Sequence, residues 1–312
     1  MSPTAARRKA TRPNAAPEQR IEVRKTYKMY IGGAFPRSES GRTYEVSDTR
    51  GRFLANTAMG SRKDARDAVV AARGAFGTWA AATAYNRGQV LYRVAELMEG
   101  RRAQFAAEVA AAEGLTPDRA DNVVSQAIDR WVWYAGWSDK LAQVLGGVNP
   151  VAGPYFNISA PEPTGVVAAL APQRSSLLGL VSVLAPIVVS GNTAVVLTSE
   201  QRPLPAITLS EVLATSDVPA GVINLITGRT AEIAPWLASH QDVNAIDLAG
   251  AADVDGLAWA DLERAAAENL KRVLRPAGND ADAVEPDWSP TPDLSRMKAY
   301  LETKTVWHPK GH

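Results

Sequence analysis

The pattern that most constrains the fold lies in the middle of the chain, where two apolar runs flank an apolar helix. Val166–Leu170 is a short apolar run bounded by a glycine and a proline, as expected of a strand that is buried on both faces. Residues 177–189 follow the candidate N-caps Ser175 and Ser176 and are apolar almost all round, which predicts a helix inside the protein. Thr193–Leu197 is a second apolar run. Together these segments predict a β-α-β unit, and hence a parallel sheet with a right-handed crossover.

The segments that follow continue this alternation of helices and strands. We expect helices over residues 205–215 and 230–240 and strands over residues 222–226 and 245–248. A last helix is predicted over residues 253–274. The chain is therefore predicted to be an α/β protein with a doubly wound, Rossmann-like parallel sheet and helices on both faces.

The amino-terminal half predicts a small β element followed by helices. Residues 30–35 read as a hairpin with Gly-Gly at its turn, and residues 44–46 as its return strand. Ser61 is the expected N-cap of the first helix. A long helical stretch is predicted over residues 86–113, and another helix over residues 117–145, with proline in its first turn.

Composition excludes several classes of function. The 312 residues are 46% hydrophobic and 21% charged, which is ordinary for a globular protein with a substantial core. The formal net charge of +1 gives no support for a nucleic-acid or membrane-surface partner, and the longest apolar run is too short to span a bilayer, which favours a cytoplasmic protein. The sequence has no cysteine, which excludes disulfides, thiolate metal sites and a cysteine nucleophile. Its 3 histidines show no metal-binding spacing.

The first 28 residues differ in composition from the rest of the chain. Residues 1–28 are rich in arginine and lysine, contain three prolines and have almost no apolar side chains. This predicts a disordered basic tail. An organelle transit peptide is the alternative, because the start of the segment is rich in arginine and poor in acidic residues.

Several motifs of this chain resemble those of aldehyde dehydrogenases. The central unit reads E-P-T-G-V-V-A over residues 162–168 and G-N-T-A-V-V over residues 191–196, with S-E at residues 199–200. The amino-terminal half adds Y-I-G-G over residues 30–33 and Y-A-G-W-S-D-K-L over residues 134–141. The sequence is similar to the coenzyme domain of that family, and the similarity is collinear over most of the chain.

The resemblance also implies a division into domains. Residues 29–145 and 161–275 match a coenzyme-binding-like α/β domain. Residues 146–160 match a hairpin of the oligomerisation element, and residues 294–312, which include A-Y-L-E-T-K-T-V, match its carboxy-terminal strand. Between them, residues 276–293 form a linker rich in proline and aspartate, where the family has its catalytic domain.

Three catalytic groups of the family have no counterpart at the matching positions. The family uses a thiolate nucleophile, a glutamate base in an E-L-G-G motif, and an asparagine that binds the oxyanion. This chain has no cysteine, reads R-P-A-G over residues 275–278, and has Arg174 at the asparagine position. The resemblance therefore predicts that the chain has no catalytic residues and is not an enzyme. Arg174 could instead bind an anion or form a structural salt bridge.

The coenzyme motifs are also altered. The resemblance implies cofactor contacts at Glu200, Gly228 and Gly250, which are retained. Thr230 replaces a glycine of the phosphate-binding turn, and Ala251 replaces a serine whose hydroxyl contacts phosphate. We therefore expect no resident cofactor and at most weak NAD binding, and no metal.

The functional hypothesis that follows is a non-catalytic, pseudoenzyme-like subunit. It would form a hetero-oligomer with a full-length, active aldehyde dehydrogenase through residues 146–160 and 297–307, and so scaffold or regulate it. Self-association through the same segments is the alternative assembly. A residual NAD(H)-binding or sensing module is the second hypothesis. An enzyme of another kind that uses Arg174, and a decaying gene product, are weaker ones.

Overall fold

The computed structural model describes residues 25–252, 254–275 and 285–311. The tail predicted over residues 1–28 lies outside the described residues except for its last four positions. The first half of the predicted linker, residues 276–284, is likewise outside them, whereas its second half is described.

A five-stranded parallel sheet forms the centre of the molecule, in the order β10-β9-β6-β7-β8. Its strands are β6 (Val166–Leu170), β7 (Thr193–Leu197), β8 (Ile223–Ile226), β9 (Ala245–Asp247) and β10 (Arg272–Leu274). Every residue of β6 and β7 is buried, as the apolar runs predicted. The predicted α/β fold class, with a doubly wound parallel sheet, is confirmed.

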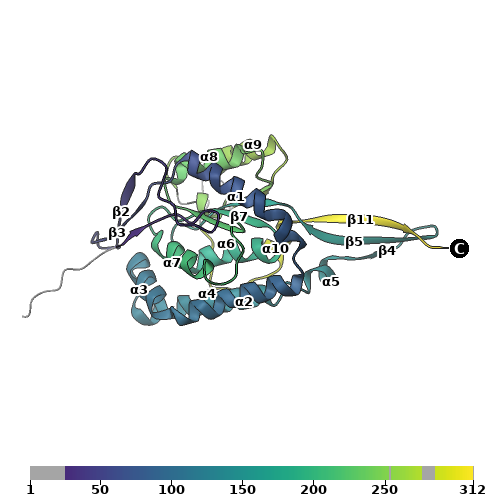
Figure 1. The fold of residues 1–312 in the computed structure, drawn as a ribbon, viewed down its shortest axis with the longest axis horizontal. Coiled ribbons are helices and arrows are strands. Elements are labelled where there is room, and N and C mark those ends of the chain that lie inside the picture. The colour runs from purple at the N-terminus through teal and green to yellow at the C-terminus, as the bar shows by residue number, and fades with distance from the viewer. Residues whose placement is uncertain (1–24, 253, 276–284, 312) are drawn as a thin grey trace, which may run out of the picture.

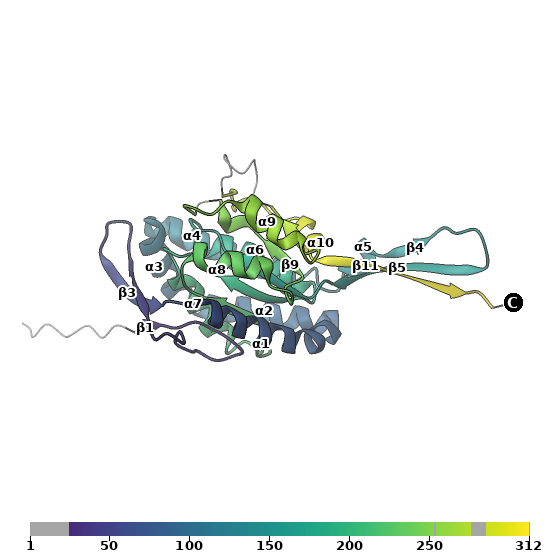
Figure 2. The ribbon, with the colours of Figure 1, turned by 90° about the horizontal axis from the view of Figure 1, so that it is seen from above.

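Helices cover both faces of this sheet (Figures 1 and 2). One face carries a layer built around α6 (Leu178–Val189), together with α2 (Ala84–Gly100), α3 (Arg102–Glu113), α4 (Pro117–Ala135), α7 (Leu204–Leu213) and α10 (Ser295–Ala299). The other face carries α1 (Arg62–Ala81), α8 (Thr230–Ser239) and α9 (Trp259–Ala267). Two separate apolar clusters result, one on each face.

Helix α6 lies between the sheet and α4, which explains why its sequence is apolar all round. All 12 of its residues are buried. Its N-cap position is Leu177 rather than either predicted serine, although the Ser175 hydroxyl accepts a hydrogen bond from Gly179 N at 2.9 Å in the first turn. Ser182, in the middle of the helix, accepts a hydrogen bond from Arg130 Nη1 at 2.6 Å. A polar side chain is tolerated there because it has a buried partner.

Two predicted helices are corrected by the structure. The helix predicted over residues 253–274 is shorter, since α9 ends at Ala267 and Leu270 adopts a left-handed backbone with φ of 58°. The chain then extends as β10, which pairs in parallel with β9, so sheet pairing overrides the helical continuation. The stretch predicted over residues 86–113 is divided at Arg101 into α2 and α3.

The amino-terminal β element also differs from the prediction. Strands β1 (Thr26–Tyr27), β2 (Thr43–Ser47) and β3 (Phe53–Ala58) form a sheet in the order β1-β3-β2. The predicted return strand therefore pairs with β3 and not with the Gly-Gly turn, where Tyr30 instead bridges to Leu225 of the central sheet. The Ser61 N-cap of α1 is confirmed, with a complete capping box to Asp64.

A three-stranded arm projects from the body of the molecule (Figures 1 and 2). After α5 (Leu141–Leu145), strands β4 (Gly147–Asn149) and β5 (Tyr155–Pro163) form its hairpin. Strand β11 (Leu301–Pro309) pairs antiparallel with all of β5, from Leu301 opposite Pro163 to Pro309 opposite Tyr155. The arm thus joins segments that are about 140 residues apart in the sequence. Within the described part of the chain, no helix has the length and apolar character needed to cross a bilayer.

Candidate functional site

The carboxyl edge of the central sheet is where an α/β protein of this topology binds ligands. From β6 the chain proceeds to β7 and β8 on one side, whereas β9 and β10 lie on the other, so the strand order reverses between β6 and β9. The loop that follows β6 and the 3₁₀ turn η1 (Ala249–Ala251) that follows β9 meet at this position. The predicted site residues can be located relative to it.

Gly250 is buried in η1, where it packs directly against the end of β6. A Cβ atom at this position would lie 2.0 Å from the carbonyl oxygen of Ala171 and 2.8 Å from that of Leu170. No side chain fits in that space. Glycine is therefore required at position 250 for the two backbones to approach each other, whether or not a phosphate binds nearby.

Glu200 lies just beyond the end of β7, and both of its carboxylate oxygens are engaged within the chain. Oε1 forms an ion pair with Arg229, and Oε2 accepts a hydrogen bond from Thr230 N, at the start of α8, at 3.0 Å. The backbone N–H of Glu200 donates to Gln173 Oε1 at 2.9 Å. A cavity of about 250 Å³ opens beside these groups.

Gly228 directly precedes Arg229 in the sequence and has a φ of 151°, a conformation that favours glycine. A Cβ atom at this position would lie 3.0 Å from Ile233 Cδ1 and 3.1 Å from Gly60 O. The structure thus places Gly228 close to Glu200, while Gln173 joins this region to Ala171 beside Gly250 through a hydrogen bond from its Nε2 at 3.0 Å.

The carboxylate of Glu200, which the resemblance assigns to the cofactor, is already engaged within the chain. A ribose hydroxyl that donated to it would share the carboxylate with Arg229 and the N–H of Thr230. The altered turn thus contributes the group, Arg229, that holds the glutamate. Weak NAD binding therefore stays a prediction.

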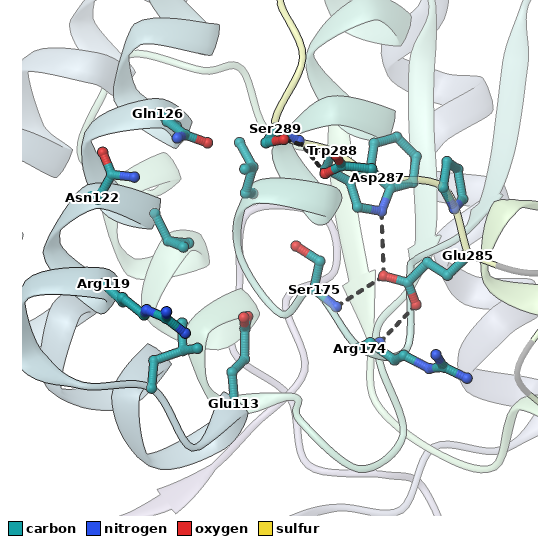
Figure 3. A pocket seen from close by; sticks show the side chains of 14 residues that line it. Glu113, Arg119, Asn122, Gln126, Arg174, Ser175, Glu285, Asp287, Trp288 and Ser289 are labelled. Carbon is teal, nitrogen blue, oxygen red and sulfur yellow. Dashed lines mark hydrogen bonds between the residues drawn. The ribbon is translucent and has the colours of Figure 1, made fainter.

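A cavity with a volume of about 740 Å³ lies at the start of α6 (Figure 3). Its walls come from the end of α3, the start of α4, the loop before α6, and residues that follow the first half of the predicted linker. The charged side chains that line it are Glu113, Arg119, Arg174, Glu285 and Asp287. Acidic and basic groups are therefore both present, against an apolar wall that includes Leu178 and Trp288.

Glu113 binds the backbone that leads into α6. Its Oε1 accepts hydrogen bonds from both Ser176 N and Ser176 Oγ at 2.7 Å. Burial raises the pKa of the Glu113 carboxyl above its ordinary value, and the nearby charge of Glu285 raises it further, while the two bonds from Ser176 act in the opposite direction. Glu113 therefore holds the loop although burial of its charged carboxylate is unfavourable.

Glu285 holds the same loop from the other side (Figure 3). Its two carboxylate oxygens accept hydrogen bonds from Arg174 N at 2.7 Å and from Ser175 N at 2.9 Å. Trp288 Nε1 donates to the same carboxylate at 3.3 Å. The backbone of Arg174 thus contacts an anion, and that anion is a side chain of this protein. The roles considered for the Arg174 side chain, anion binding or a structural salt bridge, stay predictions.

Sequence reasoning missed both carboxylates of this cavity. Glu113 is the last residue of a helical stretch, and Glu285 follows a segment without hydrophobic periodicity, so neither position gave a local signal. The signal that could have located the second segment is Trp288, because a tryptophan in a stretch of prolines and aspartates is expected to be buried. It is 8% exposed and belongs to the larger apolar cluster.

A buried polar cluster fastens the end of the chain to the carboxyl edge of β9. Asp247 is fully buried and forms an ion pair with Arg296, and its Oδ2 accepts a hydrogen bond from Tyr300 Oη at 2.6 Å. The carbonyl oxygen of Tyr300 accepts hydrogen bonds from Thr164 Oγ1 at 3.0 Å and Asn192 Nδ2 at 2.9 Å. These contacts fix the position at which β11 begins. Across residues 25–252, 254–275 and 285–311, no group of three or more potential metal ligands occurs.

Comparison with known proteins agrees with these observations. The sequence matches the aldehyde dehydrogenase family over residues 35–288. It is 32% identical to mitochondrial benzaldehyde dehydrogenase of Antirrhinum majus over 261 residues, covering 82% of this chain and 48% of that protein. It is 32% identical to retinal dehydrogenase 2 of Gallus gallus over 274 residues, covering 86% of this chain and 52% of that protein. The chain therefore spans about half the length of these relatives.

The fold is also that of solved aldehyde dehydrogenases. A structure of the enzyme from Bacillus cereus in complex with NAD+ superposes with a TM-score of 0.73 at 27% identity, covering 80% of this chain and 50% of that one. HpcC from Thermus thermophilus gives a TM-score of 0.74, also at 27% identity, covering 80% of this chain and 47% of that one.

These relatives correct one prediction. The chain was predicted not to be an enzyme, because three catalytic groups have no counterpart at the matching positions. That prediction is wrong as a classification, since the matched family and the relatives are named as aldehyde dehydrogenases. The absence of cysteine remains a fact of the sequence. With the family matched over residues 35–288 and the fold shared, this chain belongs to the aldehyde dehydrogenase family.

Proposed function

We propose that this chain is an aldehyde-dehydrogenase-family subunit that assembles with a full-length aldehyde dehydrogenase through its three-stranded arm. The observation that carries the proposal is an exposed apolar face on β4, β5 and β11. The chain spans about half the length of the relatives that it matches. The role in that assembly would be to scaffold or regulate the partner.

The apolar face is built by the register of the three strands. Val148 lies opposite Ile158, which lies opposite Val306, so the three side chains form one row across the arm. They are 69%, 45% and 48% exposed, respectively. Phe156, two positions along β5, extends the same face and is also exposed. Contiguous apolar surface of this kind usually marks a binding site.

The opposite face of the arm carries a polar network that is paired within the chain, next to the exposed rings of Tyr155 and Trp307, which lie 5.8 Å apart. Asn149 Nδ2 donates to Asn157 Oδ1 at 2.6 Å and to Ser159 Oγ at 2.7 Å. Ser159 and Thr305 share a hydrogen bond of 2.9 Å between their hydroxyl groups. The polar groups of this face are thus paired within the chain, whereas the apolar row on the other face stays exposed to solvent.

The outer edge of β11 offers a second kind of contact. This strand is nine residues long and pairs with β5 on one side only. An unpaired edge presents backbone donors and acceptors in a row, to which another strand can add. Lys304 and Glu162 form an ion pair across β11 and β5, so charge flanks the apolar row without interrupting it.

Two alternatives stand beside this proposal. The same arm could join two copies of this chain, since a self-complementary surface gives a symmetric dimer. Residual NAD(H) binding is a second candidate function, which the position of Glu200 at the end of β7 supports and its ion pair with Arg229 opposes. The Bacillus cereus relative binds NAD+ in its solved structure.

The experiment co-expresses this chain with a full-length aldehyde dehydrogenase from the same cell and measures native masses. Val306→Lys places a charge on the apolar face, and Thr303→Lys places one on the opposite face of the same strand as a matched control. We expect a mixed complex with the unaltered chain and the control, and its loss with Val306→Lys. A mixed complex that survives Val306→Lys contradicts the proposal. A complex of this chain alone would support self-association instead.

A further inference from the structure

The segment Glu285–Ser289, here called the strap, forms one wall of the 740 Å³ cavity at the start of α6. It enters the site immediately after the first part of the predicted linker and leads towards α10. Its two ends are held in different ways. One end is anchored in the core, whereas at the other end the Glu285 carboxylate binds the loop before α6 near the surface.

The anchored end is Trp288 and the residues that follow it. Trp288 is 8% exposed, and the Arg296 guanidinium lies over its ring at 4.9 Å. Arg130 Nη2 donates to Pro290 O at 2.7 Å, while its Nη1 donates to Ser182 of α6. Arg130 therefore ties the backbone after Trp288 to the central helix. These contacts bury aromatic and guanidinium groups together, so this end is fixed.

The other end is Glu285. Its carboxylate binds the N–H groups of Arg174 and Ser175 at 2.7 and 2.9 Å, and the first of these bonds is exposed to solvent. The same carboxylate lies near Glu113, whose pKa its charge helps to raise. Two acidic groups thus hold consecutive parts of one loop, and of the two it is Glu285 that makes a solvent-exposed contact.

We propose that the strap is an intramolecular closure of this cavity, in which Glu285 is a releasable latch and Trp288 the fixed hinge. When the latch is closed, the strap shields the backbone N–H groups of Arg174 and Ser175. When it is open, those N–H groups and the apolar wall formed by Leu115, Val123 and Leu178 become accessible. The inference concerns the sheet edge and is independent of assembly through the arm.

The test measures hydrogen exchange of the Arg174 and Ser175 amides in the full chain. Glu285→Ala removes the latch, and Asp287→Ala is the matched control, because Asp287 lines the same cavity but, among the described residues, its carboxylate accepts hydrogen bonds from Ser289 and not from the loop before α6. We expect Glu285→Ala to raise exchange at the two amides by about tenfold or more, since two charge-assisted hydrogen bonds are lost. The control should stay close to the unaltered chain.

A second readout is the fluorescence of the apolar dye anilinonaphthalene sulfonate, which we expect to rise with Glu285→Ala and not with the control. If Glu285→Ala does not fold, Glu285→Gln keeps one acceptor oxygen without the charge and should give a smaller increase in exchange at the same amides. Equal exchange in Glu285→Ala or Glu285→Gln and in the unaltered chain overturns the proposal. So does a rise that Asp287→Ala matches, since charge alone would then explain it.

Discussion

The hydrogen bond between Tyr300 and Asp247 gives the sharpest test of how the end of the chain is held to the sheet. Tyr300→Phe removes one hydroxyl group from a site where the tyrosine is 1% exposed and the aspartate is fully buried. Burial, and secondarily the charge of Asp247, raise the pKa of the Tyr300 phenol well above its ordinary value, so it is a donor throughout the neutral range. The substitution therefore removes a bond to a charged acceptor.

The structure sets the expected size of this effect. Asp247 keeps its ion pair with Arg296 and a hydrogen bond from Ala249 N at 3.0 Å, so its charge is not left without compensation. The loss is then that of one hydrogen bond to a charged group, about 1.5–3 kcal/mol. Removal of Arg296 would leave the aspartate charge buried and unpaired, and should cost more, about 3–5 kcal/mol.

The assay is urea unfolding at fixed protein concentration, because any self-association makes stability depend on concentration. Tyr85→Phe is the matched control, since Tyr85 is 69% exposed on α2 and should change the free energy of unfolding by less than about 0.5 kcal/mol. If Tyr300→Phe lowers that free energy no more than this control does, the bond to Asp247 does not hold the end of the chain. The reasoning about the buried cluster would then fail.

Three further substitutions test the site. Burial raises the pKa of Glu113, so the folded chain should lose stability as pH rises from the ordinary carboxyl range through that raised pKa. Glu113→Gln should remove this loss. If the stability of the variant and of the unaltered chain changes with pH in parallel, the prediction is refuted. Gly250→Ala should destabilise the fold by about 1–3 kcal/mol or more, because the added Cβ meets a backbone carbonyl. Gly74→Ala, in open space on α1, should stabilise it by up to about 1 kcal/mol. Thermal unfolding of the two variants shows whether their changes in stability have these opposite signs. Arg229→Ala removes the ion pair of Glu200 and should tighten NAD binding by up to about fivefold, as measured by calorimetry. If the unaltered chain already binds NAD with a dissociation constant in the low micromolar range, about −8 kcal/mol, the ion pair does not oppose the coenzyme.

The arm bears most directly on the biological role of the chain. Its apolar row and its open edge are both features that a free monomer would leave in water. The match covers only about half of each relative, and the activities of the relatives belong to whole proteins. Assembly, cofactor binding and activity are therefore separate questions, and the native masses, the calorimetry and an aldehyde assay of the complex address them one by one.

The sequence by itself determined the central sheet. The apolar runs of β6 and β7, with an apolar helix between them, allow little other than a buried parallel pair, because each side chain of such a run needs an apolar neighbour. The Ser61 cap was equally local, since the capping box lies within four consecutive residues. Family motifs then located the segments that form β5 and β11, which local pattern alone could not have paired.

Only the tertiary structure decided the rest. Arg272–Leu274 followed a helical pattern and became β10, because the edge of β9 offered it backbone partners. Glu200 was expected to contact a cofactor, and the fold places Arg229 against it within the chain. Glu285 lay in a stretch without periodicity, yet it binds amides 110 residues away. Contacts between residues so far apart in the sequence form only where the sheet brings distant loops together, and a local sequence pattern does not predict that place.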